Sequence, residues 1–380
     1  MINKGLISIR KNLSNIPGWQ TRKKIIVFES DDWGSIRTSN IDAVNRLNAK
    51  GIDFVSLDAR RYSYNDTLAT SEDLSALFDL LISFKDWKFN PVVFTAISLV
   101  ANPDFDAIKR SGFLRYHYET LPETLKRYPG CEGSFELWKE GICNGIFIPQ
   151  FHGREHLNVT SWMHALKHQH LETIEVFNEG MWGYVNSHFD GRKINYQEAF
   201  NYHDPTELLF LEGILKDGLD LFERLFGYRA ELFVAPNGAF PNILEKCLND
   251  YGISFISQSK LQHEIIGYGK TRLVFHYLGM KNKLGQIYLT RNCFFEPGSH
   301  LKNDWVDSCM YDIETAFRWH KPAIICSHRV NYVGSLNLNN RQKSLRQLKE
   351  LLMRIRNKWP DVEYMSSAQL GSLILKGEKI

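Results

Sequence analysis

Short apolar runs alternate along the chain with longer segments whose apolar residues recur at helical spacing. The first run, Ile25 to Phe28, is partly β-branched and follows charged residues, which predicts a short buried strand. Similar runs predict further strands at 92–97, 145–151, 184–187, 231–235, 253–257, 272–277, 286–290, 322–326 and 362–365. Helical spacing predicts helices at 41–49, 70–84, 161–177, 206–226, 241–250, 304–319, 340–358 and 367–375. This alternation predicts an α/β fold with a mainly parallel sheet.

Residues 101–145 interrupt the alternation and are rich in Gly, Pro and Tyr, so we predict a loop-rich insertion or lid there. The chain has neither a low-complexity linker nor a repeat of solenoid period. We therefore predict one elaborated domain, 23–376, with an insertion at about 101–145. An N-terminal extension, 1–22, precedes it.

Composition narrows the classes of function. The 380 residues are 43% hydrophobic and carry a net charge of +3, which predicts a large core and gives no electrostatic footprint for nucleic acid. The six cysteines are scattered without CxxC spacing, which argues against a zinc knuckle and a disulfide framework. The first 22 residues lack the apolar core of a signal peptide, and no stretch has the roughly 20 apolar residues of a membrane span. We therefore expect a cytoplasmic protein.

Two adjacent carboxylates, Asp31 and Asp32, follow the first predicted strand. The carboxyl ends of strands are where α/β folds place their sites. Two acids there repel each other unless a cation or a shared proton separates them. A metal on one and a proton-transfer role for the other would resolve the conflict, whereas the plainer alternative is a helix N-cap beside a solvated neighbour.

Two histidines four residues apart, His152 and His156, directly follow the strand predicted at 145–151. They could hold one ion at a strand end. His164 and His168 share this spacing but lie inside a predicted amphipathic helix, so we expect ordinary surface or packing roles for them.

A further histidine, His328, ends the apolar strand predicted at 322–326. It is a candidate proton carrier, because the unperturbed pKa of histidine lies near neutrality. The alternative is a histidine that bonds a neighbouring loop.

Together these residues resemble the motifs of the polysaccharide deacetylase family, carbohydrate esterase family four. The shared order is Asp-Asp after the first strand, His-x-x-x-His, a Pro-x-Gly turn, and a strand that ends in His; it spans roughly residues 24–370. The resemblance implies a distorted (β/α) barrel with loop insertions. It also implies metal-dependent removal of acetyl groups from N-acetylated sugars.

The same resemblance assigns roles by position. Asp31 matches the catalytic base and His328 the catalytic acid. Asp32, His152 and His156 match the three metal ligands, for which zinc is the first expectation, while Co²⁺, Ni²⁺ and Mn²⁺ also suit such a set.

Several positions depart from the family pattern. The arginine that steadies the family's base is replaced by Val234, and the tyrosine of the same motif by Asn237. The aspartate often found after the catalytic histidine is Arg329. Arg291 follows a predicted strand and is the candidate to replace the missing arginine; its alternative is a surface ion pair with Glu296.

We therefore expect a hydrolase that deacetylates an N-acetylated sugar or glycan precursor, with the segment 101–145 shaping its cleft. Two alternatives stay open. His152 to His156 also fits the His-x-x-Glu-His pattern of inverted zinc peptidases, with Glu155 as the base. The second alternative is a sugar-binding protein that has the same barrel but no catalytic activity. The altered Pro-x-Gly turn favours this alternative.

Overall fold

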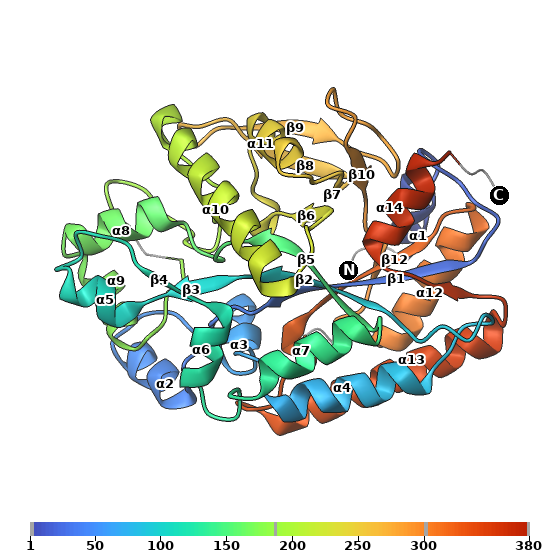
Figure 1. Cartoon of the computed structure of the whole chain (residues 1–380), viewed down its shortest axis with the longest axis horizontal. Coiled ribbons are helices and arrows are strands. Elements are labelled where there is room, and N and C mark those ends of the chain that lie inside the picture. Colours follow the sequence, from blue (N-terminus) through green and yellow to red (C-terminus); the bar gives the residue numbers. More distant parts are fainter. Residues whose placement is uncertain (1–3, 186–187, 300–302, 378–380) are drawn as a thin grey trace.

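The computed structural model describes residues 4–185, 188–299 and 303–377 (Figure 1). Its main sheet has nine strands in the order β10-β7-β6-β5-β2-β1-β12-β11, with β13 beside the start of β1, and every pairing is parallel. The strands are β1 Ile25–Trp33, β2 Phe94–Leu99, β5 Phe147–Gly153, β6 Leu232–Val234, β7 Phe255–Ser257, β10 Ile287–Leu289, β11 Cys293–Phe294, β12 Ala323–His328 and β13 Glu363–Tyr364. Two antiparallel ribbons stand apart, β3 Ala101–Pro103 with β4 Tyr118–Thr120, and β8 Leu261–Ile265 with β9 Thr271–Phe275.

The main sheet curls into a half-barrel. Residues 290–292 connect β10 at one end of the strand order directly to β11 at the other, so the two edges come close together. No ladder joins β10 to β11 among the residues described, and the barrel stays open there. The predicted α/β fold, a distorted (β/α) barrel, is confirmed.

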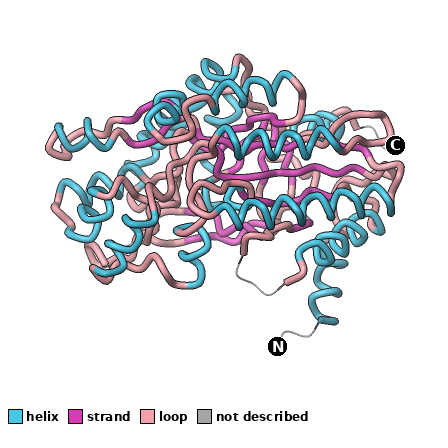
Figure 2. The backbone as a smooth tube through the Cα atoms, turned by 90° about the horizontal axis from the view of Figure 1, so that it is seen from below, coloured by secondary structure: helices cyan, strands magenta, loops and turns pink. Residues whose placement is uncertain are grey.

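Helices cover the outside of the sheet (Figure 2), and α4, α7 and α13 lie side by side along it (Figure 1). The helices are α1 Lys4–Ser14, α2 Ile41–Ala49, α3 Leu57–Ser63, α4 Ser71–Ser83, α5 Phe105–Arg110, α6 Leu121–Arg127, α7 Ser134–Cys143, α8 Val159–Lys167, α9 Leu171–Asn178, α10 Leu208–Phe226, α11 Glu245–Asp250, α12 Trp305–Arg318, α13 Leu338–Lys358 and α14 Ser367–Leu375. Single 3-10 turns occupy Pro205–Glu207, Pro236–Gly238, Asn242–Leu244 and Arg329–Asn331. None of these helices is long and apolar enough to cross a membrane.

The central strand is longer than the apolar run predicts. β1 continues past Phe28 to Trp33 and is buried at every position, because β2 and β12 flank it on its two edges. Its pairing with β12 runs on to Asp31, which lies opposite His328. β1 thus continues through polar residues, and only its apolar part is recognisable as a strand in the sequence.

Three local predictions need correction. The helix predicted at 161–177 is two helices, α8 and α9, which break where Gln169 adopts a left-handed φ of 57°. Apolar periodicity misses this break because both helices bury apolar residues in the same core. Residues 101–145 hold β3, α5, β4, α6 and α7 and are therefore less loop-rich than predicted. The hairpin β8–β9 was not predicted as a hairpin, and the strand predicted at 184–187 lies partly outside the described residues. The boundaries 1–22 and 23–376 stay predictions.

Candidate metal centre and acid–base site

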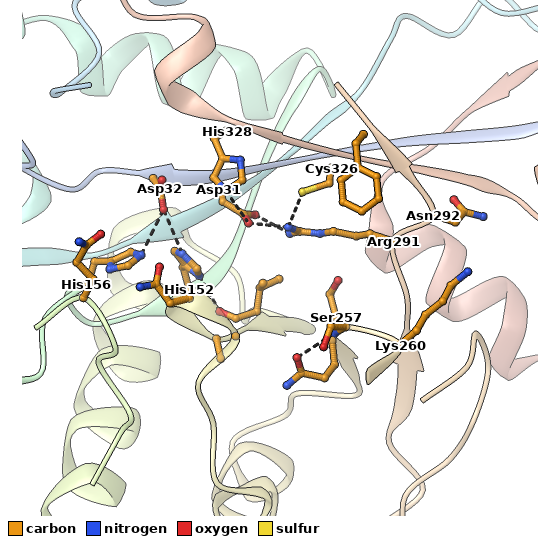
Figure 3. A pocket seen from close by; sticks show the side chains of 18 of the residues that line it. Asp31, Asp32, His152, His156, Ser257, Lys260, Arg291, Asn292, Cys326 and His328 are labelled. Carbon is orange, nitrogen blue, oxygen red and sulfur yellow. Dashed lines mark hydrogen bonds and ion pairs between the residues drawn. The ribbon is translucent and has the colours of Figure 1, made fainter. Parts of the chain in front are cut away.

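Polar side chains from three strand ends meet in one cavity (Figure 3). Because all strands of the sheet are parallel, their carboxyl ends lie at the same edge. Asp31 and Asp32 come from β1, His152 from β5 and His328 from β12. The cavity has a volume of about 510 Å³, which is in the range of pockets for small molecules.

A local distortion turns both carboxylates of β1 toward this cavity. Neighbouring side chains of a regular strand point to opposite faces. Here Asp32 has a φ of 74°, and the pairing of β1 with β2 shifts between Ser30 and Trp33. A left-handed φ at a residue other than glycine costs energy and persists where the surrounding structure enforces it.

Asp32, His152 and His156 form a compact group of three potential ligands. The Asp32 Oδ1 atom lies 3.5 Å from His152 Nε2 and 3.4 Å from His156 Nε2. All three side chains are buried, and their ligand atoms lie within 4.8 Å of one another. These separations match the roughly 3.4 Å expected between two ligands that sit about 2.1 Å from one ion in tetrahedral geometry.

The two imidazoles are oriented for this task. The Nδ1–H of His152 donates to the Val234 carbonyl at 2.7 Å, so its Nε2 lone pair is directed toward Asp32. The ring of His156 stacks on Trp182 with centroids 5.9 Å apart, and its buried Nδ1 has no hydrogen-bond partner among the described residues. Burial lowers the pKa of His156 and so favours the neutral form that a metal ligand needs.

The electrostatics of Asp32 agree with a ligand role. Burial alone would raise the pKa of this carboxyl, but the imidazoles of His152 and His156 beside it hold that pKa well below its usual value. Two imidazoles and one carboxylate form a donor set that suits a divalent ion and leaves further positions open. The residues therefore fit a single metal, with zinc first.

The second carboxylate, Asp31, is held by an arginine. Arg291 donates from Nη2 and Nη1 to the two oxygens of Asp31, both at 2.6 Å, and from Nε to Glu29 at 2.5 Å. Burial alone would raise the pKa of Asp31, but the guanidinium outweighs it and lowers the pKa below its usual value. Arg291 thus binds both oxygens of Asp31, which the apolar side chain of Val234 could not do. Its alternative partner, Glu296, makes no ion pair with it in the described part of the chain.

Replacing Arg291 by methionine is expected to lower the free energy of unfolding by about 3–5 kcal/mol, because breaking a buried ion pair leaves Glu29 and Asp31 uncompensated. Urea unfolding followed by circular dichroism measures this loss. Adding Glu29→Gln to the same chain should restore part of it, because one buried charge disappears. Arg229→Met is the control, since it removes only an exposed pair with Glu223. Equal losses in Arg291→Met and Arg229→Met would contradict the prediction.

His328 is paired with a second carboxylate. Its Nδ1 lies 2.5 Å from Glu296 Oε1, and its Nε2 lies 3.8 Å from Asp31 Oδ2. Glu296 also accepts from Arg61 and from Asn331. Burial alone would lower the pKa of His328, but Glu296 outweighs it and, with Asp31 and Asp32, raises that pKa to about 9. His328 therefore carries a proton at neutral pH.

Of three other residues singled out in the sequence, Asn237 lines the cavity, whereas Arg329 and His164 do not. Asn237 lines the cavity on the turn after β6, with a left-handed φ of 53° and an exposed side chain. Arg329 is fully buried outside the cavity lining, where it bonds Asp66 and the Ser35 carbonyl. The exposed His164 bonds Asp190 on the surface.

Several contributors were not predicted from the sequence. Glu29 and Glu296 support the acid–base residues, and only their closeness to strand ends could have marked them. The segment 101–145 supplies none of the residues that line the cavity; α1 and the residues after it do, with Lys11 and Asn15. The expectation that 101–145 shapes the cleft was therefore wrong.

Comparison with known proteins shows a likeness in structure alone. No protein-family model and no curated protein matches the sequence. Among solved structures, the chain is similar to Puue allantoinase, at 9% identity over 96% of this chain and 95% of that one, with a TM-score of 0.49. It is also similar to a probable polysaccharide deacetylase from Pseudomonas aeruginosa PAO1, at 10% identity over 95% and 93% of the two chains, with a TM-score of 0.47. A pseudoenzyme of carbohydrate esterase family four from Bacillus anthracis matches at 9% identity over 92% and 66%, with a TM-score of 0.36.

The solved structures that the chain is similar to thus include one described as a probable polysaccharide deacetylase. With identities near 10% and TM-scores below 0.5, their activities are not transferred to this chain.

Proposed function

We propose that this protein is a metal-dependent hydrolase that removes the acetyl group from an N-acetylated sugar or glycan precursor. One observation carries the proposal. A cluster suited to a metal, Asp32 with His152 and His156, opens into the same cavity as an ionised carboxylate, Asp31, and a protonated imidazole, His328. Amide hydrolysis needs this combination, because the carbonyl must be activated, a water deprotonated and an amine protonated.

Asp32, His152 and His156 would hold the ion, which when bound supplies Lewis-acid activation of the acetyl carbonyl and makes water more acidic. Asp31, free of the metal, accepts the proton of the attacking water. Arg291 fixes both oxygens of Asp31, so this base has one orientation. The lowered pKa of Asp31 keeps it ionised and ready to accept a proton.

His328 donates its proton to the departing amine. An amine expelled without a proton is a very poor leaving group, so this step is essential. Glu296 binds Nδ1 and leaves Nε2 facing the cavity beside Asp31. Positioned acids and bases of this kind typically contribute about 10²–10⁴-fold each.

The peptidase alternative has less support. The pattern His-x-x-Glu-His belongs inside a helix. Here His152 is the last residue but one of β5, and the residues after the strand are not helical up to Asn158. Glu155, which would be the base, is paired in a bidentate manner with Arg154 at 2.6 and 2.8 Å.

Acetate release from a panel of N-acetylated sugars tests the proposal. The panel includes monosaccharides, nucleotide-linked sugars, lipid-linked sugars and oligomers, each with the zinc-loaded and the chelated protein. We expect release that depends on the metal, and no cleavage of peptides. Sugar binding without acetate release across the panel would favour the non-catalytic alternative.

The rate should also depend on pH through His328. Activity needs its protonated form, so activity is present below the pKa of His328 and is lost as pH rises through about 9. Glu296→Gln removes the main charge that raises this pKa, so the alkaline limb of kcat/KM should move to lower pH. A bound dication lowers the pKa in both proteins, so the difference between the two profiles is the quantity to measure. Coincident alkaline limbs would contradict the pairing.

A further inference from the structure

One end of the cavity is lined by two lysines, of which one has no carboxylate partner among the described residues. We call this end the lysine arm; it is lined by Lys11, Ser14, Asn15, Lys260 and Asn292. Figure 3 shows Lys260 and Asn292 on the side of Arg291 that lies away from Asp32 and His156. The lysine arm is therefore distinct from the metal ligands but continuous with the same cavity.

Lys260 reaches into the lysine arm with only neutral partners. Its Nζ donates to the Ser14 carbonyl at 2.8 Å and to Ser14 Oγ at 3.2 Å, with a longer contact to Asn15 Oδ1 at 3.4 Å. Among the described residues, no carboxylate lies within ion-pair distance of it. The other cations of this region differ, because Lys11 pairs with Asp312 and Arg291 pairs with two carboxylates.

A second lysine without a carboxylate partner among the described residues, Lys321, lies close to Lys260. Lys321 is buried, and its Nζ donates to the carbonyls of Gly18 and Trp19 at 2.6 and 3.0 Å. Lys321 and Lys260 both line a small recess beside the lysine arm. No described carboxylate pairs with Lys321 either.

The pKa values agree with uncompensated charge. Burial lowers the pKa of Lys260 to about 8. Burial and then the charge of Lys260 lower the pKa of Lys321 to about 8. Lys11 is thus paired with Asp312, whereas the ammonium groups of Lys260 and Lys321 have no carboxylate within ion-pair distance among the described residues. Partly buried charges are normally paired, because unpaired ones are costly to desolvate.

We propose that the lysine arm binds a phosphate group of the substrate, with Lys260 as its direct contact. A phosphate monoester carries close to two negative charges at neutral pH and several acceptor oxygens, so it can supply the counter-ion that Lys260 lacks. The orientation rests on the proposed function, since the acetamido group then faces Asp31 while the phosphate faces α1. The substrate class is accordingly a phosphorylated N-acetylated sugar.

The plainer role of these lysines is to cap main-chain carbonyls. Lys260 bonds the last residue of α1, and a cation at a helix C-terminus is favourable. That role satisfies donors but leaves the charge without a counter-ion. It also predicts that removing Lys260 changes stability and affects charged and uncharged ligands alike.

The test compares an N-acetylhexosamine 1-phosphate with the matched uncharged methyl glycoside. In Lys260→Met, KM for the phosphorylated sugar should rise about 10- to 100-fold, the factor expected for one charged hydrogen bond. KM for the methyl glycoside should change less than about twofold on the same reasoning. Lys260→Arg should retain most of the affinity. Equal effects of Lys260→Met on both sugars would overturn the proposal.

Calorimetric titration with the sugar phosphate separates this inference from the proposed function, because it needs no turnover. Binding that Lys260→Met weakens supports the lysine arm even if no acetate is released. Acetate release from neutral sugars without phosphate binding overturns the lysine arm and leaves the proposed function standing. Nucleoside-diphosphate and lipid-diphosphate sugars in the same titration identify the source of the phosphate.

Two further variants show whether a loss of binding comes from the missing charge of Lys260 or from misfolding. Lys283→Met removes a lysine from an exposed turn outside the cavity and should leave all affinities unchanged. Lys260→Gln keeps a donor for the Ser14 carbonyl, so it should fold if the methionine variant does not. Unchanged phosphate affinity in folded Lys260→Gln would overturn the proposal.

Discussion

Replacing His328 by alanine is expected to lower kcat for an N-acetylated sugar by about 10²–10⁴-fold, the usual contribution of a positioned acid. The metal content should stay at the wild-type level, because His328 is not one of the three proposed ligands, Asp32, His152 and His156, and belongs to a separate group with Glu296 and Cys326. The loss should therefore fall on chemistry rather than on assembly of the site.

The leaving group makes this prediction specific. An amine needs a proton to depart, whereas an activated phenyl acetate expels a stable phenolate. His328→Ala should therefore lose far more activity on the N-acetylated sugar than on the phenyl ester. His164→Ala is the matched control, because it removes an exposed imidazole that bonds a surface aspartate away from the cavity. Equal losses on amide and ester, or near-normal turnover of the amide, would contradict an acid role.

Much of this arrangement could be predicted because strand ends are marked locally. An apolar run identifies a strand, and the polar residues that follow it must lie at the carboxyl edge of a parallel sheet. Asp31, His152 and His328 each follow such a run and line one cavity. Each of these placements needs only the type of the local element and the direction of the sheet.

What could not be predicted depends on contacts between distant segments. Arg291 reaches Asp31 because residues 290–292 connect β10 to β11 across the open side of the half-barrel. How closely those two edges approach is a property of the whole sheet. The left-handed φ of Asp32 has no local signal, because aspartate is allowed but not required there. Glu296 pairs with His328 rather than with Arg291 because it follows β11, and β11 lies beside β12, which carries His328.

The metal cluster leads to the second large effect. In His152→Ala, affinity for zinc should fall by more than the roughly 10–100-fold that loss of an outer-shell partner costs, because a direct ligand is removed. Zinc measured by mass spectrometry after dialysis should drop from about one ion per chain, the number that one such cluster holds, to a small fraction of that. The melting temperature gives a second readout, since an ion that binds the folded state stabilises it by mass action.

Addition of zinc should therefore raise the melting temperature of the chelated wild type and leave His152→Ala nearly unchanged. Asp31→Asn is the matched control within the same site. It removes the charge of the carboxylate that Arg291 holds, so turnover should fall while zinc binding and the thermal shift persist. Loss of zinc in Asp31→Asn as well would show that the two aspartates share the ion. Stoichiometric zinc in His152→Ala would remove His152 from the ligand set, and with it the division between a metal-binding Asp32 and a proton-accepting Asp31.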